Sequence, residues 1–418
     1  MTEIIQQIEH KKKSRHIKIP NGWEEKSLRD CCLIKGEYGI NAPAVEYSNK
    51  LPIYIRITDI DDDGYYSSLK KACVDDEASR DFLLKSGDIV FARTGATVGK
   101  TYLYNEKDGE LVFAGFLIRF RPDKNVLLPE YLKNFTCTKL YWDWVKVVSM
   151  RSGQPGINAE EYGQLKLHLP LIPEQKAIAQ LLYAWDKAIT KTQTLIAQKE
   201  LRKKWLMQNL LTGKKRLKGF NGVWKEYSFE KLLNVVKRNF DWDENGLYKL
   251  VSVRRRSGGL FFRESLYGHQ ILVKNLRTVE EDDFLFSKMQ ILHGASGLVT
   301  KEFAGAKISG SYIAVVPSNA QLLDIEFFQL YSQMPYFYHQ TYISSYGVHI
   351  EKMTFDFETF LQHRMKLPPI EEQKAIKKIM QAADKEIQLL KTKAERLKEQ
   401  KKGLMQVLLT GKKRLKIK

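Results

Sequence analysis

The sequence predicts a mixed α/β protein with two globular domains, each followed by one copy of a long amphipathic helix. Three observations support this prediction. Residues 169–218 realign without a gap on residues 367–416, and about half of the positions are identical. The stretches before each copy are large enough to form a domain. Both stretches contain short runs rich in β-branched and aromatic residues, separated by turn-forming residues and helical patches.

The repeat divides the chain into four predicted segments. These are a first domain at 1–168, a first helical region at 169–218, a second domain at 219–366 and a second helical region at 367–418. The predicted strands include LPIYIRITDI, GDIVFA, LVFAGFLIRF, LYKLVSV and SYIAVVP. The predicted helical patches are LPEYLKNFTCTKLYWDWV and IEFFQLYSQMPYFYHQT. Both domains begin with a similar tryptophan motif, GWE and VWK, so the duplication includes the diverged domains.

Each repeat contains signals that begin and end a helix. An LPxI turn followed by Glu and Gln stands at the start, and Thr-Gly stands at the end. Gly213 and Gly411 are therefore expected at the left-handed C′ position. The basic run KKR that follows each glycine is interpreted as favourable charge at the negative end of the helix dipole, with phosphate contact as the alternative.

Between these signals, apolar residues recur in steps of four and three, which is typical of a coiled-coil seam. The two helices are therefore predicted to pack on each other. The predicted packing residues are Ile178, Leu182, Trp185, Ile189, Leu206 and Leu210 in the first helix and Ile376, Met380, Ile387, Leu390, Leu397, Leu404 and Leu408 in the second. Three lysines, Lys199, Lys203 and Lys401, also occupy seam positions, where they could weaken the seam, fix its register or extend outward to solvent.

The composition favours a cytoplasmic protein with a polyanionic partner. The formal net charge is +19, which points to nucleic acid before membrane, although solvated lysines account for part of it. The four cysteines form no CxxC pair, which argues against a zinc site or a disulfide framework. Neither a signal peptide nor a long apolar run is recognisable.

The segment TGATVGKT follows a predicted strand and ends like a phosphate-binding loop, but its spacing does not fit. A P-loop has four residues between its glycines, whereas three separate Gly95 from Gly99. Two interpretations therefore remain open, a loop that contacts DNA backbone through Arg93, Thr94 and Lys100 or a plain tight turn. The second domain has a related loop, GASG, in which Gly294 is aligned with Gly95 and Ser296 is a candidate DNA contact.

Two further polar loops and one arginine cluster are candidate DNA contacts. Their side chains are of the types that bind base edges or phosphates, and the alternative is an ordinary surface loop. If the arginine cluster forms a strand, at most two of its three side chains can face DNA together. The candidates are Arg151, Ser152, Gln154 and Asn158 in the first domain and Arg254, Arg255, Ser345, Tyr346 and His349 in the second.

Motifs for catalysis are absent from the sequence. No paired carboxylates, HExxH, GxSxG or Cys-His arrangement is recognisable, and the aspartates at 61–63 have no identifiable partners for a cation. The only Pro-Pro pair, in LPPIEEQ, lacks the features of an adenine-methyltransferase loop. The chain is therefore predicted not to be an enzyme and to hold no cofactor or metal.

The repeated LPxIxEQKAI…LLTGKKRLK segments, with a domain before each, resemble the specificity (S) subunits of Type I restriction-modification enzymes over the whole chain. The resemblance implies an antiparallel helix pair with pseudo-twofold symmetry and two target-recognition domains that bind the halves of a split DNA sequence. It also implies two methyltransferase and two restriction motor subunits as partners, which would carry S-adenosylmethionine, ATP and Mg. Because the two domains have diverged, the target is expected to be asymmetric.

Two other functions are compatible with the sequence. A coiled-coil scaffold could join two protein-binding domains without contacting DNA. A self-contained enzyme could use the Gly-Lys-Thr loop, in which case the purified chain would turn over nucleotide.

Overall fold

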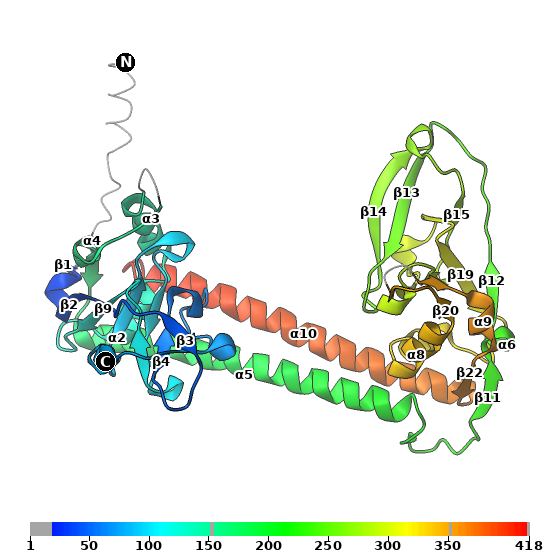
Figure 1. Ribbon diagram of the computed structural model, residues 1–418, viewed down its shortest axis with the longest axis horizontal. Helices are drawn as coiled ribbons and strands as arrows, with labels where there is room; N and C mark the ends of the chain where they lie inside the picture. Colours follow the sequence, from blue (N-terminus) through cyan, green and yellow to red (C-terminus); the bar gives the residue numbers. More distant parts are fainter. Residues whose placement is uncertain (1–18, 151–153, 351–352, 416–418) are drawn as a thin grey trace. The chain divides into compact units, whose positions relative to one another are not determined.

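The computed structural model describes residues 19–150, 154–350 and 353–415. The chain forms two compact units, Met1–Thr192 with Thr392–Lys418 and Gln193–Lys391. Two long helices, α5 (Ile172–Leu210) and α10 (Ile370–Leu408), each contribute one half to each unit (Figure 1). None of the described helices is long and apolar enough to cross a membrane.

The first unit contains two four-stranded sheets and a short strand pair. One sheet has the order β2-β9-β6-β7 (Cys32–Tyr38, Leu117–Pro122, Ile89–Ala92, Thr101–Leu103). The other has the order β3-β5-β4-β8 (Ala44–Glu46, Ala72–Val74, Ile53–Ile55, Leu111–Phe113), in which β4 and β8 are parallel. The strand pair joins β1 (Glu24–Ser27) to β10 (Lys166–Leu169). The helices are α2 (Pro129–Phe135), α3 (Lys139–Val148) and α4 (Ala159–Gly163).

The second unit repeats this plan. Its sheets have the orders β12-β19-β16-β17 (Leu233–Val236, Tyr312–Pro317, Phe284–Ser287, Ser296–Leu298) and β14-β13-β18-β15 (Leu260–Tyr267, Leu247–Val253, Lys307–Ser309, Leu276–Thr278). The strand pairs are β11 (Lys225–Ser228) with β22 (Arg364–Leu367) and β20 (Ser345–Tyr346) with β21 (Thr354–Phe355). The helices are α6 (Phe229–Leu232), α7 (Ile325–Tyr331), α8 (Pro335–Ile343) and α9 (Phe357–Gln362). The predicted duplication of mixed α/β domains is confirmed.

Strands β6 and β16 are buried along their whole length and are almost entirely apolar, because both faces of each strand are covered. In β6, Ile89 and Phe91 pack into a cluster with the helices, whereas Val90 and Ala92 pack into a second cluster with the other sheet. Strand β16 is equivalent, with its phenylalanines and its leucine in separate clusters. The two predicted helical patches each break into two helices, where Thr138 caps α3 and Pro335 occupies the first turn of α8.

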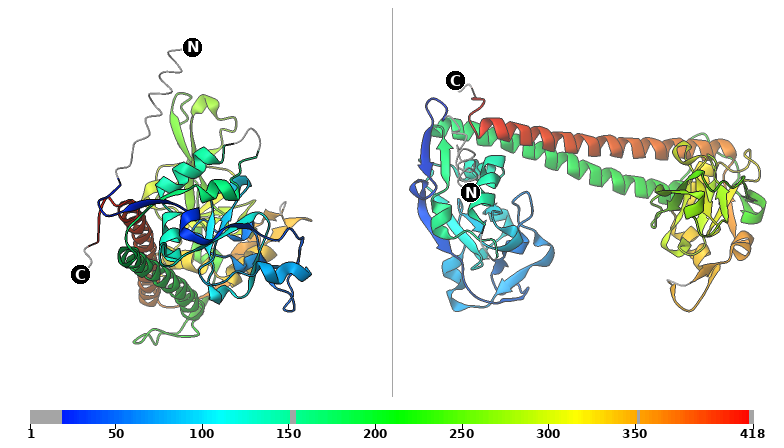
Figure 2. Two further views of the ribbon diagram at one scale, coloured as in Figure 1. Left: turned by 90° about the vertical axis from the view of Figure 1, so that its left-hand side faces the viewer. Right: turned by 90° about the horizontal axis from the view of Figure 1, so that it is seen from above.

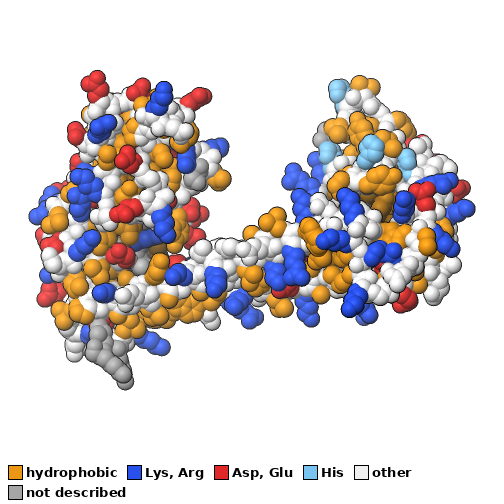
Figure 3. Space-filling model, turned by 90° about the horizontal axis from the view of Figure 1, so that it is seen from below, with side chains coloured by type: hydrophobic (Ala, Val, Ile, Leu, Met, Phe, Trp, Pro, Cys, Tyr) orange, Lys and Arg blue, Asp and Glu red, His pale blue; other side chains and the backbone are white. Residues whose placement is uncertain are grey.

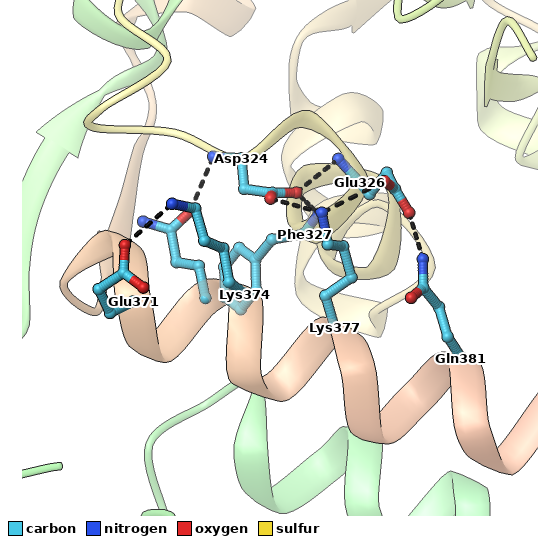
Figure 4. A network of polar contacts seen from close by, with 8 residues as sticks. Asp324, Glu326, Phe327, Glu371, Lys374, Lys377 and Gln381 are labelled. Atoms are coloured by element: carbon cyan, nitrogen blue, oxygen red, sulfur yellow. Dashed lines mark hydrogen bonds and ion pairs between the residues drawn. The ribbon is translucent and has the colours of Figure 1, made fainter.

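A buried glutamine in each repeat attaches the domain to the start of the long helix. The side chain of Gln175 accepts a hydrogen bond from the Leu128 amide at 2.9 Å and donates to the carbonyls of Val126 and Pro170, each at 2.9 Å. Gln373 makes the same three bonds in the second unit, with Asp324, Leu322 and Pro368. Figure 4 shows this region, where further polar contacts join α7 to α10.

The glutamate before each glutamine binds the arginine that follows the other helix. Glu174 is 2% exposed and accepts two hydrogen bonds from Arg414, at 2.9 and 2.5 Å. In the second unit, Arg216 makes two bonds of 2.6 Å to the fully buried Glu372, which also accepts a bond from the Trp224 indole. The arginine of the KKR run is therefore a partner for a buried carboxylate, and its interpretation as part of a helix cap is corrected.

Within each unit, the two helix halves lie side by side and antiparallel (Figure 2). All thirteen predicted packing residues are buried or half-buried. The seam lysines bind acidic residues of the facing helix: Lys401 pairs with Asp186 at 2.6 Å, Lys203 with Asp384 at 2.5 Å and Lys199 with Glu386 at 2.5 Å. Gly213 and Gly411 both have φ of 70°, as expected for the left-handed end of a helix.

Replacing Gln175 with Ala is expected to destabilise the protein, because three backbone groups lose their partner in a buried place. The free energy of unfolding should fall by about 2 to 4 kcal/mol, and Gln373→Ala should have a similar effect. Urea unfolding followed by circular dichroism measures both. Lys176→Ala, at an exposed neighbour, should change stability by less than about 0.5 kcal/mol. If Gln175→Ala and Lys176→Ala unfold with the same free energy, the three hydrogen bonds of Gln175 do not stabilise the helix start.

Candidate nucleic-acid interface

The glycine-rich loop of the first unit is a tight connection between β6 and β7. The Ala92 amide donates to the Lys100 carbonyl at 2.8 Å, and the Gly99 amide donates to the Ala92 carbonyl at 3.0 Å. Gly99 has φ of 90°, and a Cβ there would lie 2.7 Å from Val145. The Tyr141 hydroxyl donates to the Gly99 carbonyl at 2.7 Å, and burial raises the pKa of Tyr141, so this hydroxyl stays protonated. The packing therefore requires glycine at position 99.

The ammonium group of Lys100 is held by the protein itself. It donates to the Ile60 carbonyl at 3.3 Å and pairs with Asp62 at 2.6 Å, and this bond lowers the pKa of the Asp62 carboxyl. Lys100 therefore does not project into its own loop as the lysine of a P-loop does. Asp61 accepts hydrogen bonds from the amides of residues 63 and 65, so the aspartate run forms a turn. Within the described ranges, no cluster of three or more His, Cys, Asp or Glu residues could hold a metal ion.

Two loops that are far apart in the sequence meet in the first unit. Thr94 forms an isolated bridge with Gly156, and the Gly95 amide donates to the Pro155 carbonyl at 3.0 Å. Gln154 is exposed beside this crossing. The predicted contacts Arg151 and Ser152 lie outside the described residues.

Two exposed aromatic residues border the crossing and were not predicted from the sequence. The Arg93 guanidinium lies 4.9 Å from the centre of the Tyr38 ring and donates to the Gly115 carbonyl at 3.5 Å. The Arg93 amide donates to the Phe116 carbonyl at 3.0 Å, and the Phe116 side chain is 56% exposed. We call Tyr38, Arg93, Phe116 and Gln154 the first-domain surface. Large aromatic residues next to turn glycines, as in EYG and AGF, are the sequence signal that could have identified it.

Asn158 has a structural task. Its side-chain oxygen accepts a hydrogen bond from the Glu161 amide at 2.8 Å, and the Glu161 carboxylate accepts one from the Asn158 amide. This capping box begins α4. Asn158 is also exposed, so the DNA contact at this residue stays a prediction beside its role as a helix cap.

The second unit has the same crossing, with Lys288 in the place of Arg93. In the first unit, the Arg93 carbonyl also accepts from the Ile157 amide at 2.9 Å. The Lys288 amide donates to the Ser311 carbonyl at 2.9 Å, and the Lys288 carbonyl accepts from the Phe355 amide at 3.0 Å. Ser311 therefore takes the place of Phe116. The strand registers also align Gly294 with Gly99, which corrects the sequence alignment of Gly294 with Gly95.

Four predicted contacts of the second domain differ in accessibility. Ser296 is only 3% exposed on β17, so its hydroxyl cannot contact a base edge, and that prediction is corrected. The Ser345 hydroxyl donates to the Thr341 carbonyl at 2.8 Å. Tyr346, which is 66% exposed, and His349 are both accessible to a partner.

The arginine cluster forms the tip of the hairpin between β13 and β14 rather than a strand (Figure 1). Arg254 is turned back, donating to the Leu260 carbonyl at 2.9 Å and lying 4.6 Å from the centre of the Phe261 ring. Arg256 and Ser257 have φ of 57° and 53°, a conformation that costs about 1 to 3 kcal/mol for each such residue. Arg255 and Arg256 are exposed, and Figure 3 shows basic and histidine side chains gathered over this unit.

The sequence model of the Type I restriction modification DNA specificity domain matches residues 20–200 and 236–399. Each matched region covers most of one domain and most of the long helix that follows it. The putative Type I restriction enzyme MjaX specificity subunit of Methanocaldococcus jannaschii is 27% identical over 442 residues, covering 98% of this chain and 97% of the relative. The Type I restriction enzyme MjaVIII specificity subunit of the same organism is 23% identical, with the same coverage.

Solved structures share the fold over 94% of this chain. They include the HsdS subunit from Thermoanaerobacter tengcongensis, with a TM-score of 0.55 and 17% identity, matched over 98% of its length. A structure described as the basis of complex assembly and conformational transition of the type I R-M system has a TM-score of 0.58 at 15% identity, also over 98% of its length. The family match over most of the sequence, together with the repeated helix and crossing, leads to one conclusion: the chain belongs to the specificity-subunit family of Type I restriction-modification enzymes.

Proposed function

We propose that this chain is the non-catalytic, sequence-specific DNA-binding subunit of a Type I restriction-modification system. Each domain would recognise one half of a bipartite, asymmetric DNA target. The observation that carries the proposal is the crossing that occurs once in each unit. It keeps a basic residue at one backbone position, Arg93 or Lys288, while the neighbouring side chain changes from Phe116 to Ser311.

The chemistry of the first-domain surface supports DNA recognition. An arginine can bind the two acceptors of a guanine edge, and an exposed aromatic ring can contact a thymine methyl group. The ring of Tyr38 restricts the guanidinium of Arg93, which reduces the conformational entropy lost on binding. The net charge of +19 adds attraction to DNA that does not depend on base sequence.

In this proposal, the helix pair sets the spacing of the two half-sites and binds the methyltransferase subunits. Two methyltransferase and two restriction motor subunits would complete the complex in the cytoplasm, and S-adenosylmethionine, ATP and Mg would belong to those partners. The apolar side chains Leu201 and Trp205 support a docking role, because they are 69% and 47% exposed and lie four residues apart on α5.

Arg93→Ala is expected to weaken recognition of one half-site and leave the other unchanged. The loss of a base contact should reduce the affinity of the complex with its methyltransferase for target DNA by about 1 to 3 kcal/mol, or roughly 5- to 150-fold. Methylome sequencing of cells that carry the variant should show relaxed sequence in one half of the target. Lys288→Ala should affect the other half.

Arg80→Ala is the control, since Arg80 is exposed in the same domain and does not belong to the first-domain surface. It should leave the methylated sequence intact. If Arg93→Ala and Lys288→Ala both assemble normally and methylate the wild-type sequence at the wild-type rate, these residues do not recognise DNA. A wild-type complex without affinity for any duplex would instead favour the scaffold function.

Trp205→Ala combined with Leu201→Ala should weaken binding of the methyltransferase subunit. Tryptophans at the centre of interfaces contribute about 2 to 4 kcal/mol, so the dissociation constant should rise by about 30-fold or more. Calorimetry with the purified methyltransferase measures it. Arg202→Ala, at an exposed neighbouring position on α5, is the control and should bind normally. Unchanged affinity of the double variant would place the docking surface elsewhere.

A further inference from the structure

A cavity of about 420 Å³ lies in the second unit, between the β13–β14 hairpin tip and the glycine-rich loop. Arg255 and Arg256 line it from the hairpin, and Leu292, His293 and Tyr338 line it from the loop and α8. Two of these five residues are arginines, which carry a positive charge at every physiological pH. None of the five carries a carboxylate.

The hairpin tip is fixed against the loop by three hydrogen bonds. The Arg256 amide donates to the His293 carbonyl at 2.6 Å, and the Ser257 amide donates to the Gly294 carbonyl at 2.8 Å. The hydroxyls of Ser257 and Tyr338 are 2.8 Å apart. Arg256 and Ser257 are also the only consecutive non-glycine residues with positive φ among the described residues. These bonds hold the backbone of the arginine pair in place before any ligand arrives, which lowers the entropy lost on binding.

The equivalent connection in the first unit has a different charge. Strands β4 and β8 pair in parallel there, as β13 and β18 do in the second unit, so residues 56–71 correspond to the hairpin tip. This segment also contacts the glycine-rich loop, through the bonds from Lys100 to Ile60 and Asp62. It contains four aspartates and three basic residues, whereas residues 254–259 contain three arginines and no acid. One position in the fold thus carries opposite charge in the two domains.

We propose that Arg255 and Arg256 form a phosphate clamp, a site for one backbone phosphate of DNA next to the second half-site. The ligand is a phosphodiester group, which arginine can bind through two parallel N–H donors. The first-domain segment has one more acidic than basic residue and lacks the arginine pair, so this position anchors DNA backbone in the second domain alone. This inference rests on the proposed function.

The test is the salt dependence of DNA binding by the full chain in complex with its methyltransferase. A short duplex of unrelated sequence is the probe, because a phosphate contact does not depend on base sequence. The variant is Arg255→Ala with Arg256→Gly, in which glycine accepts the positive φ without strain. The slope of log K against log salt should decrease in magnitude by about 1, because each phosphate contact contributes about 0.9.

Two matched variants make the result specific. Arg263→Ala removes one positive charge from β14 of the same hairpin, where Arg263 pairs with Glu264, and it should keep the wild-type slope. Arg255→Lys keeps the charge and should also keep the slope. If the Arg255/Arg256 variant has the wild-type slope, or if Arg263→Ala reduces it equally, the clamp is refuted while the proposed function stands.

Other outcomes are equally decisive. If the wild-type complex shows no salt-dependent binding to any DNA duplex, the proposed function itself fails. If the variant loses binding of a nucleoside triphosphate but keeps the DNA slope, the cavity is a nucleotide site and the clamp is refuted.

Discussion

The pairing of a buried glutamate with an arginine from the other helix is the interaction on which the rest of the structure depends. Each glutamate stands at the start of one long helix, and its arginine stands just beyond the end of the other. A carboxylate this deeply buried is stable only with a charged partner, so parallel or shifted helices would leave an unpaired charge. The adjacent glutamine then attaches the domain to the same helix turn. Orientation, register and domain attachment therefore all depend on the EQ dipeptide and the KKR arginine.

This constraint explains why the repeats stayed similar while the domains diverged. A change of Glu174 would require a matching change at Arg414, and the two positions are far apart in the sequence. The side chains of the loops at the crossing need no matching partner residue, because main-chain hydrogen bonds fix the conformation of these loops. Their side chains can change without loss of the fold. The exchange of Phe116 for Ser311 at the same backbone position is an example of the variation that such a frame permits.

The sequence predicted those parts of the structure that follow from periodicity. The mixed α/β domains, the helix pair and the left-handed glycines at the helix ends were predicted correctly. Individual ion pairs and hydrogen bonds between distant segments of the domains could not be predicted, because no local pattern records them. The buried aspartates that immediately precede β6 and β16 illustrate this limit: Asp88 pairs with Arg121 of β9, whereas Asp283 pairs with Arg238, which follows β12.

The candidate site was partly predictable for the same reason. Polar loops were recognised by their composition. A polar side chain in a loop can either bind another group of the protein or contact a ligand, and only its partners in the structure distinguish these two roles. Asn158 caps a helix and Lys100 binds an aspartate turn, so both are occupied within the protein. Exposed aromatic residues such as Phe116 have no comparable structural task, because burial would stabilise the fold more than exposure does. The exposure of these aromatic residues is therefore a stronger sign of a binding surface than the polarity of the loops.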